Sequence, residues 1–299
     1  MSDLILVTGA AGTLGRAVIP ALLGAGFAVR AGDVRPIEVP AGVESIELDV
    51  RDASAVERAT RGVAGMLHAA AWHGIHLGEH PPADFWELNA TGTFKVLQAA
   101  LGNGVRAAVL SSTMGVYGES RQAAEDGPSV RIHEDLPLRP GDVYGASKVV
   151  AEELSRYFAR RGVSGVSLRY GMFVPEPFLH AGIRFLYGGV DERDVAAANI
   201  LALRRLLDGP PGTHLGAFNI ESALPWDEAD GRPLRADPST VIARHWPDAP
   251  ALLDRAGTQP WGPIHEWYDI RRAAEVLGWR PHFGFTEFMA ALREGRAQL

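Results

Sequence analysis

The chain has 299 residues, of which 46% are hydrophobic and 22% charged, so it can bury a large core. Its formal net charge is −7 without a basic block, which argues against nucleic acid as a partner. It contains no cysteine, which excludes disulfides and cysteine nucleophiles, and no apolar run approaches the ~18 residues of a membrane span. We therefore expect a cytoplasmic protein with no membrane partner.

Apolar runs and helical periodicities alternate along the chain, which is typical of βαβ units around a parallel sheet. Strands are predicted near 4–8, 27–32, 44–48, 65–69, 106–111, 164–169 and 215–220. Helices are predicted near 13–25, 53–61, 83–103, 143–161, 192–208 and 284–296, with a kink at Pro20 in the first. The stretches 120–142 and 221–264 are rich in Pro and Gly, which predicts loops or a small lobe rather than sheet.

A glycine turn, Gly9-Ala10-Ala11-Gly12-Thr13-Leu14-Gly15, joins the first strand to the first helix. This arrangement presents backbone N–H groups and a helix N-terminus to a dinucleotide pyrophosphate. Asp33 follows at the end of the second strand, where a carboxylate accepts hydrogen bonds from the adenosine ribose and repels a 2′-phosphate. NAD is thus favoured over NADP, although Arg35 is a group that can accommodate that phosphate. The predicted contacts here are Gly9, Ala11, Gly12, Thr13, Leu14, Gly15 and Asp33.

The third and fourth strands end in Asp49-Val50 and His68-Ala69-Ala70, which should line the same crevice. Asp49 can accept a hydrogen bond from the adenine amino group while Val50 packs on the ring. Taken alone, Asp49 reads more simply as a helix N-cap or a solvated turn residue. We expect Asp49, Val50, His68, Ala69 and Ala70 to contact the cofactor.

His68, His73, His76 and His80 lie close together in sequence, beside Glu79. Imidazoles at such spacing can bind zinc or nickel, but hydride chemistry requires no metal. We therefore predict no metal site, and expect this loop to touch a polar substrate, with His73 as a contact. Four tryptophans are expected to be buried anchors of a C-terminal lobe: Trp246, Trp261, Trp267 and Trp279.

Tyr144 and Lys148 lie four residues apart on a predicted helix, so they share one face. A neighbouring ammonium favours phenolate and lowers the tyrosine pKa from its usual ~10. Lys148 can also hydrogen-bond the nicotinamide ribose, so we expect Tyr144 and Lys148 to be cofactor contacts as well. The strand before this helix ends in Ser111-Ser112-Thr113, which brings hydroxyls to the same crevice. These groups predict hydride transfer in which a hydroxyl holds the substrate oxygen and Tyr144 moves its proton. For an isolated Y-x-x-x-K pair, an exposed helix-surface pair is the alternative.

With these motifs, the chain resembles the extended short-chain dehydrogenases of the NAD-dependent epimerase/dehydratase family, over essentially its whole length. The matching residues are T-G-A-A-G-T-L-G at 8–15, Asp33, Asp49-Val50, H-A-A-A at 68–71, Asn89, S-S-T-M-G-V-Y-G at 111–118, Tyr144 with Lys148, Leu168-Arg169-Tyr170 and Leu277-Gly278-Trp279-Arg280-Pro281. The resemblance implies that Thr113 is the catalytic hydroxyl, with Ser112 as the alternative, and that Asn89 belongs to the cofactor site. It also implies a homodimer formed through a helix pair that includes the Tyr144 helix.

Departures from the family pattern narrow the activity. Met114-Gly115 stands where dehydratases of the family carry Asp-Glu, so elimination of water lacks its proton donors. The run Arg169-Tyr170-Gly171-Met172-Phe173-Val174-Pro175-Glu176-Pro177 lacks the asparagine of many nucleotide-sugar epimerases and is similar to uronate dehydrogenases. That similarity implies that Arg184, ten residues before Asp194, clamps a substrate carboxylate. An ion-paired surface arginine is the alternative. The expected substrate contacts are His73, Thr113, Met114 and Arg184.

The sequence thus predicts an α/β protein with a Rossmann-type doubly wound parallel sheet and a small C-terminal lobe. Residues 1–170, with 191–220 returning to them, would form the NAD-binding domain, and 171–190 with 221–299 the substrate-binding lobe. The predicted function is NAD-dependent hydride transfer at a hydroxyl carbon of a sugar or sugar acid. An NAD-dependent sugar epimerase is the alternative, and a non-catalytic NAD(P)-sensing protein is a third hypothesis, disfavoured because Tyr144 and Lys148 are both present.

Overall fold

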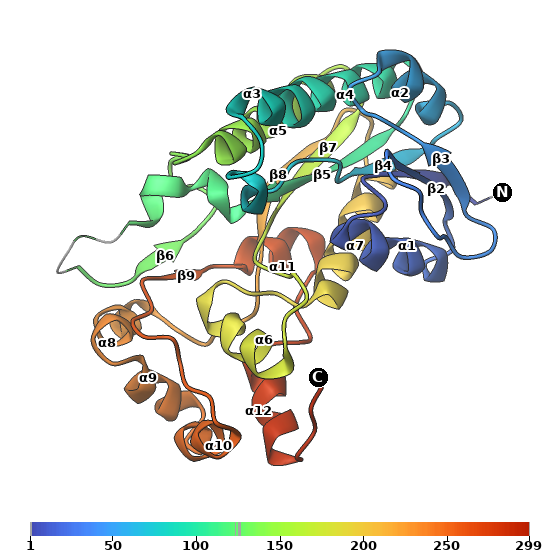
Figure 1. The fold of residues 1–299 in the computed structure, drawn as a ribbon. Helices are drawn as coiled ribbons and strands as arrows, with labels where there is room; N and C mark the ends of the chain where they lie inside the picture. The colour runs from blue at the N-terminus through green and yellow to red at the C-terminus, as the bar shows by residue number, and fades with distance from the viewer. Residues whose placement is uncertain (1, 123, 125–126, 299) are drawn as a thin grey trace.

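The computed structural model describes residues 2–122, 124 and 127–298 (Figure 1). Residues 1, 123, 125–126 and 299 belong to predicted segments but lie outside the described residues. The strands are β1 (Leu4–Thr8), β2 (Ala28–Asp33), β3 (Glu44–Glu47), β4 (Gly65–His68), β5 (Ala107–Thr113), β6 (Val130–Ile132), β7 (Ser164–Tyr170), β8 (His214–Ile220) and β9 (Glu266–Tyr268). The helices are α1 (Thr13–Gly24), α2 (Ala53–Thr60), α3 (Pro82–Phe85), α4 (Gly92–Gly102), α5 (Val143–Ala159), α6 (Phe178–Arg184), α7 (Glu192–Leu207), α8 (Gly231–Ala236), α9 (Pro238–His245), α10 (Ala249–Ala256), α11 (Arg271–Leu277) and α12 (Phe285–Arg293).

A seven-stranded parallel sheet in the order β3-β2-β1-β4-β5-β7-β8 forms the centre of the molecule. Helices α2, α4 and α5 cover one face, and α1, α7 and α11 cover the other (Figure 1). The central strands are buried on both faces, which is why they read as nearly continuous apolar runs. The predicted doubly wound Rossmann-type sheet is confirmed, and its strand order reverses between β1 and β4, where such sheets bind ligands.

The helix predicted over 83–103 is interrupted. It consists of α3, a π-helical segment η2 (Trp86–Thr91) and α4. Single-turn π segments of this kind are frequent at functional sites, and this one contains Asn89. Helix α1 continues through the exposed Pro20, so the proline does not end it.

Helices α6, α8, α9, α10 and α12 pack around a second hydrophobic core at the carboxyl end of the chain (Figure 1). Beside them, β6 pairs in parallel with β9. The prediction that 120–142 contains no strand is therefore wrong, because β6 is a three-residue strand whose partner lies more than 130 residues later. Helix α11 packs on α7 and β8 of the main sheet instead of in this second core.

The prediction that four tryptophans are buried anchors of the C-terminal lobe is right for Trp246 and Trp267, wrong in location for Trp279 and wrong in burial for Trp261. Trp246 and Trp267 are buried in the second core, and Trp279 is buried against the main sheet, where its Nε1 donates to the Asp194 carbonyl oxygen (2.9 Å). Trp261 is 42% exposed. It lies in a loop, and its ring contacts His180 and Tyr187. Within the described residues, no helix has the length and apolarity that crossing a membrane requires.

Candidate functional site

The glycine turn has the shape of a nucleotide-binding turn. Gly9 has φ +68°, and a Cβ there would lie 2.6 Å from the Ala70 nitrogen, while a Cβ on Gly15 would lie 2.3 Å from the Ala10 carbonyl oxygen. Both positions therefore require glycine. Helix α1 begins after Gly12 without a side-chain cap, which leaves its first N–H groups for a ligand such as the NAD pyrophosphate. The Leu14 side chain is buried in the core, so only its backbone can serve that ligand.

Asp33 lies beside this turn, as predicted. Its Oδ2 accepts from the Ala11 N–H (2.9 Å), and its Oδ1 accepts from the Arg35 N–H (2.9 Å) and Nε (3.2 Å). The carboxylate is only 5% exposed, whereas the Arg35 side chain is 62% exposed. Strand β2 thus ends with a carboxylate held next to the helix N-terminus, the place where a dinucleotide ribose is recognised.

Asp49 and Val50 contribute less directly to the crevice. Arg51 donates to Asp49 through Nη2 (2.8 Å), and this bond holds the pKa of the Asp49 carboxyl below its usual value. The N-cap of α2 is Asp52, so Asp49 is not a helix cap. Val50 is 1% exposed and packs in the core beside Gly92, so its side chain does not present a free surface for an adenine ring.

His68 is a buried part of the frame. Its Nδ1 hydrogen-bonds with Thr8 Oγ1 (2.7 Å) and its Nε2 with Thr93 Oγ1 (2.9 Å). Burial lowers the pKa of His68 to about 3, so the ring is neutral at physiological pH. The N–H groups of Ala69 and Ala70 donate to the same Thr8 hydroxyl (3.2 Å each). His68 therefore sets the position of the backbone after β4.

Asn89 ties two elements together from the π-helical segment. Its Oδ1 accepts from the Trp72 N–H (2.8 Å), and its Nδ2 donates to the Trp72 carbonyl (2.9 Å) and to Ser147 Oγ (3.0 Å). The side chain is 1% exposed. Asn89 therefore joins the loop after β4 to helix α5. Its amide groups are already used in these bonds, so it supports the site without a direct contact to the cofactor, in contrast to the prediction.

The histidine loop packs on itself and on the site. His80 stacks on Trp72 with ring centroids 3.9 Å apart, and the His73 ring lies 5.0 Å from that of Tyr144. Burial lowers the pKa of His73. In the described part of the chain, no three His, Asp or Glu side chains are grouped to hold a metal ion.

Thr113, Tyr144 and Lys148 come together at the carboxyl end of β5. Thr113 Oγ1 accepts from the Gly115 N–H (3.1 Å), and the Thr113 side chain lies near Tyr144, where it favours the phenolate. The Lys148 ammonium lies 6.0 Å from the centre of the Tyr144 ring and donates to the Ser111 carbonyl (2.9 Å). Burial raises the pKa of Tyr144 to about 12 and lowers that of Lys148 to about 8. In the protein alone, the phenol therefore holds its proton more tightly than the ammonium does, which differs from the lowered tyrosine pKa expected from the sequence because burial penalises the phenolate.

Ser112 does not join this group. Successive side chains of a strand point to opposite faces, and the Ser112 hydroxyl donates to Glu152 Oε1 (2.6 Å). Glu152 in turn pairs with Arg169 (2.7 Å), and both side chains are 2% exposed. The alternative of Ser112 as the catalytic hydroxyl is therefore wrong by geometry. Sequence reasoning missed this buried pair, whose only signal was two charges in apolar surroundings.

Arg184 is ion-paired. Its Nη2 and Nε donate to the two carboxylate oxygens of Glu176 (2.8 and 3.2 Å), and its guanidinium lies 4.3 Å from the Trp261 ring centre. It lines a cavity of about 220 Å³ with Met172 and Phe185. Asp194, which defined the spacing, is buried and accepts from the His282 and Phe283 N–H groups. The Arg184 guanidinium thus already binds a carboxylate within the protein, as in the ion-paired alternative given above for this residue.

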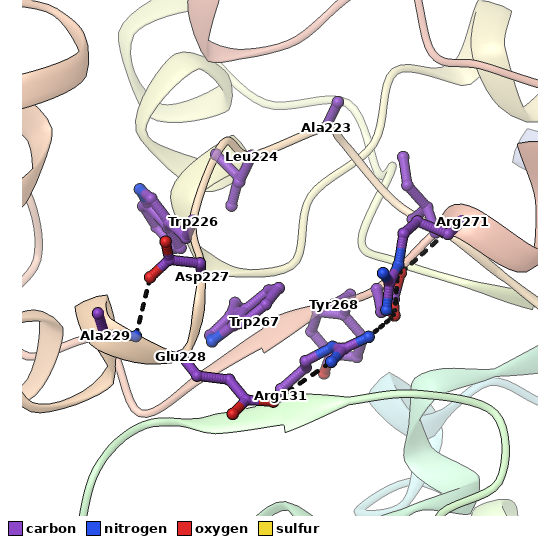
Figure 2. Close-up of a pocket in the computed structure, with 12 residues that line it drawn as sticks. Arg131, Ala223, Leu224, Trp226, Asp227, Glu228, Ala229, Trp267, Tyr268 and Arg271 are labelled. Atoms are coloured by element: carbon purple, nitrogen blue, oxygen red, sulfur yellow. Dashed lines mark hydrogen bonds and ion pairs between the residues drawn. The ribbon is translucent and has the colours of Figure 1, made fainter.

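Met114 points toward another group of residues, since its Sδ lies 3.3 Å from the Tyr268 hydroxyl. The Tyr268 ring also lines a larger cavity, of about 530 Å³, below the β6–β9 pair. Figure 2 shows Trp267 and Tyr268 in the middle of this lining, with Trp226 on one side and Arg271 on the other. No motif pointed to this cavity, because its walls come from three separate segments.

Comparisons with known proteins agree with this geometry. The model of the NAD dependent epimerase/dehydratase family matches residues 5–176. UDP-glucose 4-epimerase of Streptomyces lividans is 36% identical over 94% of this chain and 92% of its own length. Uronate dehydrogenase of Pseudomonas putida is 34% identical over 58% of this chain and 62% of its own length. A solved short-chain dehydrogenase/reductase superfamily protein of Agrobacterium tumefaciens, with bound NAD, is 27% identical, with a TM-score of 0.67 over 98% of both chains.

These findings confirm the predicted resemblance, the enzyme class and the NAD dependence. The matched segment contains the glycine turn, Asp33, Thr113, Tyr144 and Lys148. The chain belongs to the NAD-dependent epimerase/dehydratase family of enzymes.

Proposed function

We propose that this protein is an NAD-dependent dehydrogenase that oxidises a hydroxyl carbon of a sugar. The observation that carries the proposal is the group of Thr113, Tyr144 and Lys148 at the sheet edge where the glycine turn also opens. A bound NAD accepts the hydride. The protein must therefore hold the substrate hydroxyl and remove its proton, and this group contains one residue for each task.

Thr113 holds the substrate oxygen by its hydroxyl, which is already fixed by the Gly115 N–H. Tyr144 takes the proton from that oxygen as general base. Lys148 favours the phenolate form of Tyr144 through its charge, and its own position is fixed by the Ser111 carbonyl. Asp33, Gly9, Gly12 and Gly15 form the part of the crevice that fits the cofactor.

A sugar epimerase is the second candidate function, favoured by the 36% identity to UDP-glucose 4-epimerase over most of both chains. An epimerase uses the same proton and hydride transfers but returns the hydride to the opposite face of the intermediate. Absorbance of NADH and NMR of the sugar distinguish the two when the protein is incubated with NAD and free aldoses, uronic acids or UDP-sugars. Stoichiometric NADH supports the dehydrogenase, whereas a new sugar isomer without net NADH supports the epimerase.

We also propose a homodimer formed through α4 and α5. Phe94, Leu101 and Tyr157 on these helices are exposed by 36–39%, which is unusual for large apolar side chains on one helix pair. Light scattering coupled to size exclusion tests this: Phe94→Glu with Tyr157→Glu should give a monomer, and a wild-type monomer contradicts the proposal. A cytoplasmic location stays a prediction.

A further inference from the structure

A second group of polar side chains packs together just beyond the candidate catalytic residues. It consists of Arg121, Glu221, Glu266 and Tyr268, which we call the acid–arginine cluster. Arg121 Nη1 donates to Glu266 Oε1 (2.8 Å) and to the Tyr268 hydroxyl (3.3 Å), and that hydroxyl donates to the same Glu266 oxygen (3.0 Å). Glu221 interacts electrostatically with both Glu266 and Arg121. The segment after β5, the end of β8 and strand β9 supply these residues.

The acid–arginine cluster adjoins Thr113 along two neighbouring strands. Met114 follows Thr113, and its Sδ lies 3.3 Å from the Tyr268 hydroxyl and 3.8 Å from Arg121 Nη1. Gly171 follows Tyr170, the ladder partner of Thr113, and a Cβ on Gly171 would lie 1.9 Å from Glu221 Oε2. The Glu221 carboxyl therefore lies against Gly171, the residue that follows this ladder pair, and Met114, the residue after Thr113, contacts the cluster.

Within the part of the chain that the structure describes, three polar atoms of this cluster are buried without a hydrogen-bond partner: Glu221 Oε1, Glu221 Oε2 and Arg121 Nε. Glu221 is 1% exposed. Buried polar groups are almost always paired, so unpaired ones at an active site point to a partner that arrives with a ligand. A hydroxyl both donates and accepts, so one hydroxylated molecule can satisfy the acceptors of Glu221 and the donor of Arg121.

The charges around the site favour a neutral ligand. The guanidinium of Arg121 is neutralised by Glu266, and that of Arg184 by Glu176. Burial and the neighbouring Glu266 raise the pKa of Glu221 well above its ordinary value. A substrate carboxylate or phosphate placed here would find both of these guanidiniums already held by glutamates, so neither offers it a free positive charge. A neutral polyol meets no such repulsion, and a protonated Glu221 can donate to one of its oxygens.

We propose that Glu221 and Arg121 bind hydroxyl groups of the substrate and select a neutral, multiply hydroxylated sugar over anionic sugars. The inference rests on the proposed function and adds the substrate class to it. For a substrate to reach both Thr113 and the acid–arginine cluster, the Met114 side chain has to move. Its unbranched thioether adapts easily to such a change.

The test compares Glu221→Leu, Glu221→Gln and wild type as full-length protein, with aldoses and the corresponding uronic acids as substrates. Glu221→Leu should raise the KM for the aldose at least about tenfold and leave the KM for NAD within about twofold, since its site is separate. Glu221→Gln should raise the KM for the aldose less than Glu221→Leu does, because an amide still donates and accepts hydrogen bonds. Glu228→Gln is the matched control, since Glu228 is an exposed glutamate that lines the cavity of about 530 Å³ and does not belong to the cluster.

A series of deoxy-aldoses gives a second measurement that needs no folding comparison. Loss of the hydroxyl that reaches the cluster should lower the wild-type kcat/KM by the same factor as Glu221→Leu, and should have no further effect in that variant. A folded Glu221→Leu with unchanged KM for every aldose overturns the inference. A wild type that prefers the uronic acid to its aldose overturns it as well.

Failure of the proposed function is measured separately. Calorimetric binding of the aldose in the presence of NADH does not require turnover. If no sugar gives NADH or an isomer, the proposed function fails, and loss of calorimetric aldose binding in Glu221→Leu still supports the inference. Equal binding by the variant and wild type overturns it.

Discussion

The cofactor side and the substrate side of the candidate site differ in how their buried polar groups are paired. On the cofactor side, both ring nitrogens of His68 and the whole amide of Asn89 are hydrogen-bonded within the protein. On the substrate side, both oxygens of Glu221 and the Nε of Arg121 have no hydrogen-bond partner among the described residues. The cofactor side is thus held in place by hydrogen bonds within the protein. On the substrate side, a ligand has to supply the missing hydrogen bonds.

The largest effect is expected from Tyr144→Phe. Removing the phenol oxygen removes the general base, so kcat should fall by at least about 10³-fold, while the Kd for NAD stays within about threefold. Stopped-flow hydride transfer and calorimetric titration with NAD measure the two quantities. Tyr157→Phe, an exposed residue of the same helix, is the control. Retained turnover in Tyr144→Phe would refute the assignment of the base.

The pH dependence of oxidation should show the coupling of Tyr144 to Lys148. With pKa values of about 12 and about 8, the pair loses its first proton near pH 8. The phenolate–ammonium form holds one proton, so its population rises up to about tenfold per pH unit below pH 8 and levels off above it. Pre-steady-state rates from pH 6 to 10 should follow this curve.

In Lys148→Met the levelling off should disappear, because Tyr144 then titrates alone at high pH. The rate at pH 7 should fall below that of wild type, and the curve should still rise at pH 10. An identical curve in both proteins would show that Lys148 does not act on the tyrosine.

A smaller effect is expected for Asp33→Ala. The carboxylate holds the Ala11 and Arg35 N–H groups, and its loss releases the Arg35 side chain toward a 2′-phosphate. The ratio of kcat/KM for NAD to that for NADP should fall about 10- to 100-fold, measured with one substrate. Asp49→Ala, which removes only the pair with Arg51, should change the ratio much less. An unchanged ratio in Asp33→Ala would separate Asp33 from cofactor choice.

The smallest effect concerns the substrate side. Glu176→Gln frees part of the Arg184 fork, so the KM for uronic acids should fall by no more than about fivefold, the range of a partly exposed ion pair. Glu192→Gln, in the lining of the same small cavity, is the control. An unchanged or raised KM would show that the Arg184 guanidinium does not bind the acid.

Sequence reasoning reached the cofactor side because its signals are local. The glycine turn and Asp33 lie within one βαβ unit, and Tyr144 and Lys148 lie within one helix, so short spacings bring each set together, and the family resemblance then indicated their roles. The strands of the main sheet are buried on both faces and read as apolar runs. The π-helical segment around Asn89 carries no such signal, since its side chain is held by Trp72 and Ser147 from other elements.

By itself, the sequence determined the Rossmann-type sheet, and it predicted the glycine turn and the Tyr144–Lys148 pair as parts of the site, because periodicity and short spacings encode them. Only the tertiary structure decided that Ser112 faces Glu152, that Trp261 is exposed, and that Glu221 lies unpaired beside Arg121 and Glu266. Burial and pairing of a polar side chain depend on which distant segments surround it. For Glu221 those segments lie about 100 residues before it and about 45 after it, a relation that no local pattern expresses.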